Sequence, residues 1–423
     1  MGEIDILLGL QWGDEGKGKI VDALTPEYDI ITRFQGGPNA GHTLEFENEK
    51  YILHTIPSGI FREDKLNIIG NGLVIDPSVF LGEIRSLQKP VSELVNRIII
   101  SSKAHLILPT HRLLDAAYEE SKGDMKIGST LKGIGPAYTD KTSRQGLRVG
   151  ALLSDNFRET YYIHRQRHLN ILQNHKIETD LEESEKEWFE GIELMKKFRI
   201  INTEYFINRT LDEANRILAE GAQGTMLDID FGSYPFVTSS NTISAGACSG
   251  MGISPRKIGN VFGIFKAYCT RVGEGPFPTE LSNNTGIKLR DSGHEYGSTT
   301  GRPRRCGWLD LPALKYSCMI NGVTSLFMTK ADVLTGFDKI KVCTSYKIND
   351  SFVEELPYDI GAEVEPVYIE MNGWKEDITG IRKYNKLPAA LREYIDFIEK
   401  ETGIPVNIVS VGPDRSEAII RDE

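Results

Sequence analysis

The sequence predicts an α/β protein built on a large, mostly parallel central β-sheet that is flanked by helices. Three observations lead to this prediction. Short apolar runs alternate with helical patterns along the 423 residues, a glycine-rich turn joins the first run to the first helical pattern, and no repeat or low-complexity tract interrupts the series. Alternating strands and helices are typical of parallel sheets that are covered on both faces.

The predicted elements follow one another along the chain. The apolar runs lie at residues 4–8, 29–32, 67–70, 97–101, 217–221, 261–265, 325–329 and 406–410, and helical patterns at 110–121 and 388–402 separate some of them. Residues 43–54 predict a β-hairpin with its turn at residues 48–50. Residues from about 154 to 216 are charged and carry no strand signal, so we expect a helical excursion there. Because no linker composition occurs, we expect a single domain over residues 1–423.

The composition is that of an acidic globular protein. The chain has 49 Lys+Arg and 60 Asp+Glu, which gives a formal net charge of −11. This charge argues against unspecific nucleic-acid binding, so an anionic ligand must be held by a local site. No run is long and apolar enough for a membrane span, and the five cysteines form no Cys-x-x-Cys pair. We expect a cytoplasmic protein with reduced thiols that binds neither nucleic acid nor membrane.

The first strand and helix enclose a loop suited to phosphate. Residues 11–19 read QWGDEGKGK, and their three glycines let backbone N–H groups approach an anion closely. The N-terminus of the following helix adds a positive dipole end. The arrangement is P-loop-NTPase-like, although the spacing is shorter than in the standard motif. A carboxylate is unusual beside phosphate, so Asp14 indicates either a Mg²⁺ ligand or a general base; a loop carboxylate bonded to backbone N–H groups is the alternative.

A second motif follows the strand at residues 325–329. Thr329, Lys330, Ala331 and Asp332 form the Thr-Lys-x-Asp pattern by which many GTP-binding proteins read guanine. The Asp accepts hydrogen bonds from guanine N1–H and the exocyclic amine, and adenine offers no such pair of donors. A further strand ends at Ser410, and the residues after it would form a wall of the base pocket. We therefore expect the guanine-pocket elements within residues 325–423.

Five segments resemble the adenylosuccinate synthetase family. They are residues 11–19, 36–43 (GGPNAGHT), 133–138 (GIGPAY), 221–241 and 299–305 (TTGRPRR), and the resemblance runs from about residue 4 to 421. It implies a ligase of AMP biosynthesis that joins IMP and L-aspartate into adenylosuccinate. GTP would be hydrolysed to GDP and phosphate, and the reaction would pass through 6-phosphoryl-IMP. The resemblance also implies one Mg²⁺ per subunit and a cytoplasmic homodimer.

The resemblance assigns a role to each matching residue. The catalytic residues would be Asp14 as base at N1 of IMP, His42 as donor toward the transferring phosphoryl group, and Gln223. The metal ligands would be Asp14 and Gly41. The GTP contacts would be Gly13, Glu15, Gly16, Lys17, Gly18, Lys19, Gly41, Thr43, Arg304, Lys330, Asp332, Ser410 and Gly412. The IMP contacts would be Asp14, Lys17, Asn39, His42, Thr130, Gln223, Thr238, Arg302 and, from the neighbouring subunit, Arg144. The aspartate contacts would be Ser298, Thr299, Thr300, Gly301, Arg302 and Arg304.

Two positions depart from the family pattern. Lys132 stands where some members have arginine, and it supplies a point charge in place of a fork. Pro303 also replaces an arginine of some members and stiffens its loop.

Two other functions compete with the ligase. A regulatory GTPase would use the guanine motif but has no use for Asp14 or the arginine loop. A relative that takes a deoxyguanylate in place of IMP would lack a base at position 14.

Overall fold

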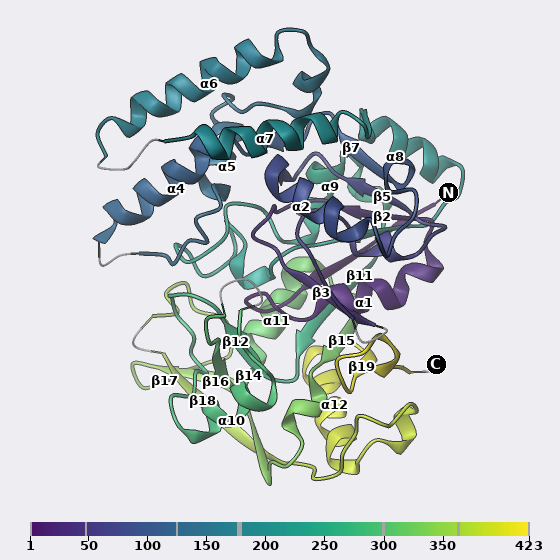
Figure 1. The fold of residues 1–423 in the computed structure, drawn as a ribbon. Coiled ribbons are helices and arrows are strands. Elements are labelled where there is room, and N and C mark those ends of the chain that lie inside the picture. Colours follow the sequence, from purple (N-terminus) through teal and green to yellow (C-terminus); the bar gives the residue numbers. More distant parts are fainter. Residues whose placement is uncertain are drawn as a thin grey trace.

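The computed structural model describes residues 2–46, 49–123, 126–175, 180–297, 301–361 and 364–421. Within these ranges one large sheet holds ten strands, and every neighbouring pair is parallel except the last at one edge (Figure 1). In spatial order the strands are β20 (Ala418–Ile420), β19 (Val406–Ser410), β15 (Ser325–Thr329), β11 (Ile258–Lys266), β1 (Ile4–Gly9), β10 (Ile217–Glu220), β2 (Ile30–Arg33), β5 (Leu66–Ile69), β7 (Ile98–Ser101) and β9 (Arg199–Ile201). The predicted fold class is confirmed.

The central strands are buried because both faces of the sheet are covered. Along β1, Ile6 and Leu8 belong to the largest core cluster, whereas Leu7 points to the opposite face. There it packs in one cluster with Ile20 and Val21 of α1 (Lys17–Leu24). Side chains alternate between the two faces of a strand, so a strand that is apolar throughout fits only between two layers.

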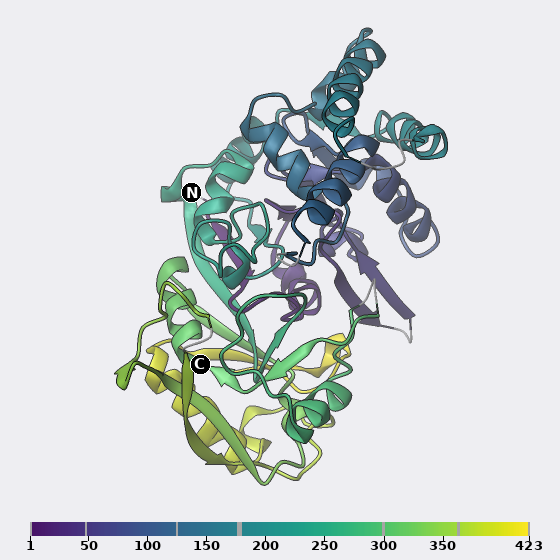
Figure 2. The same cartoon turned by 90° about the vertical axis from the view of Figure 1, so that its left-hand side faces the viewer.

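One expectation for residues 154–216 is wrong. The segment does hold helices, α6 (Phe157–Leu172), α7 (Glu182–Met195) and α8 (Thr203–Asp212), but it also holds β9, which pairs in parallel with β7. The strand has three residues at the edge of the sheet, and none of them is fully buried. So short and half-exposed a strand leaves no apolar run for a pattern to detect. In Figure 2 the helices α6 and α7 project from the end of the molecule opposite the green strands of the second sheet, whereas α8 packs against the central sheet.

The hairpin is confirmed. Strand β3 (His42–Phe46) pairs antiparallel with β4 (Glu49–Leu53), and the predicted turn residue 48 lies outside the described residues. The first strand starts at His42, one residue earlier than expected.

Two further pairs of strands are short. They are β6 (Val74–Ile75) with β8 (His105–Leu106), and β12 (Cys269–Arg271) with β13 (Arg305–Gly307).

A second sheet was not predicted. It consists of β14 (Leu309–Asp310), β16 (Lys339–Ile348), β17 (Ser351–Val353) and β18 (Glu365–Asn372). Its longest strands, β16 and β18, pair antiparallel and are interrupted by charged side chains, so their apolar signal is weak. The remaining helices are α2 (Pro77–Leu87), α3 (Leu94–Arg97), α4 (Pro109–Ser121), α5 (Ile134–Thr142), α9 (Ser244–Met251), α10 (Asn284–Ser292), α11 (Leu311–Asn321) and α12 (Ala389–Thr402). In the described part of the chain, none of the helices combines the length and the apolarity that crossing a bilayer requires.

Candidate active site

The predicted site residues gather at the carboxyl edge of the sheet. Asp14 follows β1, Gln223 follows β10, Asp332 follows β15 and Gly412 follows β19, and these four strands run parallel. The carboxyl ends of parallel strands meet at one edge, where α/β proteins bind their ligands. Bonds join the segments directly: Thr329 Oγ1 donates to the carbonyl of Glu15 at 2.7 Å.

The two acids of the phosphate loop have different surroundings. Glu15 is buried, and its carboxylate accepts hydrogen bonds from the N–H groups of Gln11 (3.1 Å) and Gly13 (2.9 Å) and from Lys17 Nζ (2.7 Å). Its side chain therefore shapes the loop and leaves only the backbone for a ligand. Asp14 is exposed with φ +61°, and its Oδ2 pairs with Arg304 Nε at 2.8 Å. Asp14 is thus the acid of this loop that faces outward.

His42 is held by a carboxylate that sequence reasoning missed. Its Nδ1 bonds Glu220 Oε1, and Glu220 also accepts from the N–H (2.8 Å) and Oγ (2.6 Å) of Ser58. Burial, with Arg33 nearby, lowers the pKa of His42 to about 4, although Glu220 acts in the opposite direction. The imidazole is therefore neutral at pH 7, with its hydrogen on Nδ1. The one available signal was a glutamate that ends an otherwise apolar strand.

Several site atoms are buried and have no hydrogen-bond partner within the described residues. They are Oε1 and Nε2 of Gln223, Oδ1 of Asn39, Nε2 of His42 and Oδ1 of Asp332. Buried polar atoms in folded proteins are nearly always hydrogen-bonded. A cluster of such exceptions at one edge of the sheet is therefore suited to a polar ligand.

The guanine motif lies beside the phosphate loop. Lys19 Nζ donates to Ser410 Oγ at 2.8 Å and to the carbonyl of Gly412 at 2.5 Å. Burial lowers the pKa of Lys19 to about 8, although nearby carboxylates including Asp332 act against it. Burial also raises the pKa of Asp332, while Lys330 counteracts it. The predicted base pocket and phosphate loop therefore form one continuous polar region.

The other predicted residues are placed less uniformly. Thr238 is half-buried, whereas Thr130, Arg302 and Arg144 are exposed, and Arg144 follows α5 with φ +64°. The three loop residues predicted to bind aspartate at positions 298–300 lie outside the described residues. Lys132 Nζ donates to the carbonyl of Pro38 at 2.8 Å, which places this lysine beside the segment that carries Asn39.

A second cluster of potential metal ligands lies among α4, α5 and α6. His111 Nε2 (3.1 Å) and His168 Nε2 (2.9 Å) both contact Asp140 Oδ2. However, His111 Nδ1 accepts from the N–H of Leu108, so its Nε2 carries the proton. The guanidinium of Arg167 bonds both Asp140 and His168. A protein cation already neutralises the carboxylate, and the nitrogen-rich set is unsuited to Mg²⁺.

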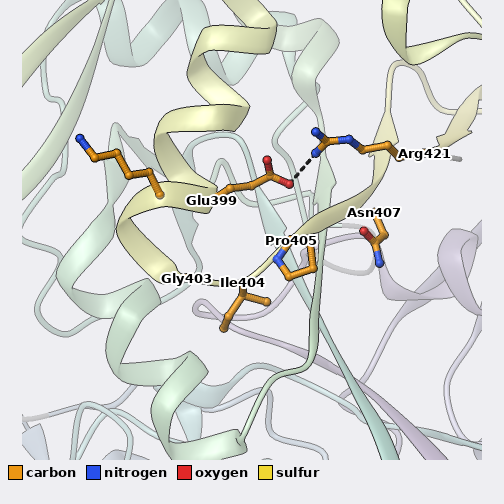
Figure 3. Close-up of a pocket in the computed structure, with 7 residues that line it drawn as sticks. Glu399, Gly403, Ile404, Pro405, Asn407 and Arg421 are labelled. Carbon is orange, nitrogen blue, oxygen red and sulfur yellow. Dashed lines mark hydrogen bonds and ion pairs between the residues drawn. The ribbon is translucent and has the colours of Figure 1, made fainter. Parts of the chain in front are cut away.

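A surface hollow of about 730 Å³ lies away from this edge (Figure 3). It is lined by residues of the end of α12 and the start of β19, among them Gly403, Pro405 and Asn407. Arg421 Nη1 and the N–H of Val406 both donate to Glu399 Oε1 beside it. Because β19 begins here and ends at the predicted base pocket, the hollow lies at the opposite edge of the sheet from the candidate site.

The fold and the site together define a class of protein. A phosphate loop with an outward carboxylate, a neutral histidine fixed by a glutamate and a guanine motif meet at one sheet edge, which describes a nucleotide-dependent enzyme of the α/β class. The comparisons with known proteins then specify the family. The family model for adenylosuccinate synthetase matches residues 6–419, and the chain belongs to this family.

Individual relatives agree with this assignment. Adenylosuccinate synthetase of Bacteroides fragilis is 60% identical over 419 residues, which cover 99% of both chains. The synthetase of Flavobacterium psychrophilum is 59% identical over 421 residues, 99% of this chain and 100% of the relative. The structure of fully ligated adenylosuccinate synthetase from Plasmodium falciparum has a TM-score of 0.94 at 41% identity and covers 100% of both chains.

The family determines the reaction. The protein is a GTP-hydrolysing ligase that forms adenylosuccinate from IMP and L-aspartate, and a regulatory GTPase is thereby excluded. Cyanophage S-2L succinoaminodeoxyadenylate synthetase, bound to dGMP and dATP, has a TM-score of 0.65 at 21% identity and covers 100% of this chain and 96% of its own. That likeness shows a shared fold alone.

Proposed function

We propose that Asp14 is the general base that removes the N1 proton of IMP. The observation that carries the proposal is the contrast between the two acids of the loop, since Glu15 is buried in backbone bonds and Asp14 faces outward. O6 of IMP is a poor nucleophile while N1 keeps its proton. Deprotonation lets O6 attack the γ-phosphate of GTP, which releases GDP and gives 6-phosphoryl-IMP. The aspartate amine then displaces the phosphate at C6.

We propose one Mg²⁺ per subunit, held by Asp14 and by the carbonyl of Gly41. Both donors are oxygen atoms, which Mg²⁺ prefers, and Asp14 is accessible. When bound, the ion would neutralise charge on the phosphates. Protein groups would also bind the phosphates of GTP. The glycine-rich loop offers N–H groups, and Lys17, already bonded to Glu15, adds a fixed positive charge.

We propose that His42 donates a hydrogen bond to the transferring phosphoryl group. Its neutral ring presents an unpartnered Nε2, because Glu220 fixes the hydrogen on Nδ1. The negative charge of entering phosphates favours protonation of Nε2, and the imidazolium then stabilises the transition state. Gln223 would orient the hypoxanthine ring through its unpartnered amide atoms.

The remaining contacts follow the family pattern. We propose that the GTP pocket is formed by residues 13 and 15–19, with Gly41, Thr43, Arg304, Lys330, Asp332, Ser410 and Gly412. IMP would further contact Asn39, Thr130, Thr238 and Arg302. Aspartate would lie against residues 298–302 and Arg304. The supporting observation is that Lys17 and Lys19 lie in the helix that follows β1, that Lys330 and Asp332 follow β15, and that Ser410 ends β19, all at the carboxyl edge of the sheet.

We further propose that the enzyme is a cytoplasmic homodimer in which Arg144 enters the site of the neighbouring subunit. Arg144 is exposed, and its left-handed backbone turns the chain at the end of α5. An exposed arginine at this position could bind the 5′-phosphate of an IMP molecule that lies in the neighbouring subunit. Each chain would be a single functional unit, in which the helical excursion within residues 154–216 also contains the edge strand β9 and the guanine-pocket elements lie within residues 325–423.

The test of the catalytic proposal is Asp14→Asn, which keeps size and polarity but cannot take the proton. Turnover, followed by the absorbance of the succinylated purine, should fall about 10²- to 10⁴-fold, while IMP and GTP still bind in equilibrium dialysis. Asp64→Asn is the control, because it removes an exposed carboxylate that pairs with Lys65 at 2.8 Å. Near-wild-type turnover of Asp14→Asn would show that another group is the base.

A further inference from the structure

Four alternating charges run from the sheet core to the active site. Lys266 Nζ contacts Glu295 Oε1 at 2.7 Å, Arg304 Nη1 contacts Glu295 Oε2 at 2.7 Å, and Arg304 Nε contacts Asp14 Oδ2 at 2.8 Å. Tyr268 OH also donates to Glu295 at 2.5 Å. The guanidinium of Arg304 is therefore shared by two carboxylates, and the proposed reaction uses Asp14 but not Glu295.

The two carboxylates differ in exposure. The side chain of Glu295 is 1% exposed, whereas that of Asp14 is 35% exposed. We propose that Glu295 is a positioning residue: it holds Arg304 permanently in the site, while Asp14 is a temporary partner that Arg304 exchanges for the anionic groups of aspartate and GTP. This inference rests on the proposed function in one respect, the ligand contacts of Arg304.

The backbone of Glu295 supports the same role. The N–H of Arg304 donates to the carbonyl of Glu295 at 2.8 Å, and the N–H of Gly297 donates to the carbonyl of Arg302 at 2.8 Å. Tyr296 and Pro303 form a β-bridge between these two bonds. Main chain and side chain of Glu295 thus close the base of the loop on which Arg302 and Arg304 are carried.

The electrostatics keep Glu295 charged. Burial would raise the pKa of its carboxyl, but Lys266 and Arg304 outweigh burial and hold the pKa at about 2. Burial lowers the pKa of the Arg304 guanidinium, but Asp14 and Glu295 together raise it above its ordinary value. If Asp14 leaves, Glu295 remains as counter-ion. A half-buried guanidinium without one would be costly and would turn toward water.

The next arginine provides a matched control. Arg305 Nε donates to Glu280 Oε1 at 2.8 Å, and its Nη1 donates to the carbonyl of Gly275 at 2.7 Å. This pair has the same chemistry and is adjacent in sequence, but it is more exposed and makes no bond to Asp14. Glu280→Gln therefore removes an arginine–glutamate pair without touching Glu295, Arg304 or Asp14.

The experiment compares Glu295→Gln with Glu280→Gln in the full-length enzyme. We expect Glu295→Gln to raise the KM values for aspartate and GTP about 10- to 100-fold, as for the loss of a charged hydrogen bond, and the KM for IMP less than threefold. Glu280→Gln should leave all three within about twofold. Glu295→Asp, which keeps the charge, should reverse part of the rise in the KM values for aspartate and GTP.

Glu295→Gln leaves Lys266 without its anion. The double variant K266M/E295Q removes both charges, so it is measured in parallel, and it should show the same selective rise in the KM values for aspartate and GTP.

Arg304→Lys separates this inference from the proposed function. It should raise the aspartate KM strongly in the wild type but add less than about threefold in the Glu295→Gln background, because the two residues act as a unit. If Arg304→Lys raises the aspartate KM and K266M/E295Q does not, Glu295 is only structural and the inference fails. If Arg304→Lys changes none of the three KM values, Arg304 does not bind aspartate or GTP. The proposed ligand contacts and the inference that rests on them are then both wrong.

Discussion

At the scale of single residues, carboxylates of similar sequence context differ in function because their partners differ. Glu15 shapes the phosphate loop from inside, and Asp14 next to it faces outward. Glu220 determines the tautomer of His42. Burial alone would raise the pKa of the Glu220 carboxyl, but its neighbours, above all His42, outweigh burial and hold that pKa at about 2. An acid that is fixed by several donors orients its neighbours, whereas an acid with a free oxygen can take part in chemistry.

Asp332 is such an acid, and it leads to the first prediction. Its Oδ1 is buried without a partner within the described residues, so it is available to the two donors of guanine. Asp332→Asn should reduce kcat/KM for GTP by about 10²-fold or more. It should raise kcat/KM for xanthosine triphosphate, because the amide can donate to the carbonyl that replaces the amine of guanine.

The measurement is turnover with each triphosphate at limiting concentration. The control is Asp338→Asn, since Asp338 is six residues further along the chain, exposed and paired with Lys375 at 2.8 Å. Its nucleotide preference should equal that of the wild type. If the wild type used GTP, ATP and xanthosine triphosphate equally well, Asp332 could not be the selecting residue.

At the scale of elements, the site depends on how closely the loop after β10 approaches the phosphate loop. A Cβ atom on Gly224 would clash with the carbonyl of Gln11 and with the Glu15 carboxylate, and it would lie 2.7 Å from the nitrogen of Gly13. Most of these neighbours are backbone atoms that cannot rotate away. The position therefore requires glycine for close approach and not for its backbone angle, since φ there is −147°.

Gly224→Ala should consequently destabilise the protein by about 1–3 kcal/mol and raise the KM for GTP, because the loop must move to admit the methyl group. Denaturant unfolding and initial rates measure the two effects. Gly82→Ala in the interior of α2 is the opposite case: nothing lies within 4 Å of its added Cβ. That variant should be more stable by about 0.5–1 kcal/mol with unchanged kinetics. Equal behaviour of the two variants would contradict the close-approach argument.

At the scale of the whole molecule, the proposed dimer can be tested by complementation. Arg144→Leu should raise the KM for IMP with a smaller effect on GTP, and Asp14→Asn should nearly abolish turnover. If each site combines Asp14 of one chain with Arg144 of the other, a mixed dimer has one site with both lesions and one with neither. Activity at low IMP should then exceed that of either variant alone.

Subunit exchange is verified by mass or by labelling before the activities are compared. A mixture that exchanges fully yet gains no activity would place Arg144 in the site of its own chain. Mixing the Asp14→Asn variant with itself at the same total concentration controls for stabilisation by protein concentration alone.

Acid stability is a second property of the whole molecule. Burial lowers the pKa values of His42, His105 and His111 to about 4 each, below the ordinary value of 6.5. Between these values the unfolded chain binds more protons than the folded one, so acid favours unfolding. The unfolding temperature should therefore fall as the pH decreases from about 6.5 to 4. His105→Asn should flatten this dependence, and a constant unfolding temperature over that interval would contradict the burial argument.

The sequence by itself determined the fold class and the hairpin, and it placed the predicted phosphate loop and guanine motif directly after strands. These features depend on neighbours in the chain: apolar runs mark buried strands, and a loop that directly follows such a strand must lie at its carboxyl end. The strands at residues 325–329 and 406–410 were predicted with their observed bounds for this reason. The separate motifs could be expected at one edge from the sequence alone.

The tertiary structure decided the rest, because partners distant in the chain leave no local pattern. Glu220 meets His42 across 178 positions, and Arg304 meets Asp14 across 290. Neither glutamate that orients a site residue, Glu220 or Glu295, belongs to a recognisable motif. The edge strand β9 and the second sheet were missed because half-exposed strands carry charged side chains. Which carboxylate is buried and which is exposed is decided only when the strands have packed, because burial is a property of the folded chain.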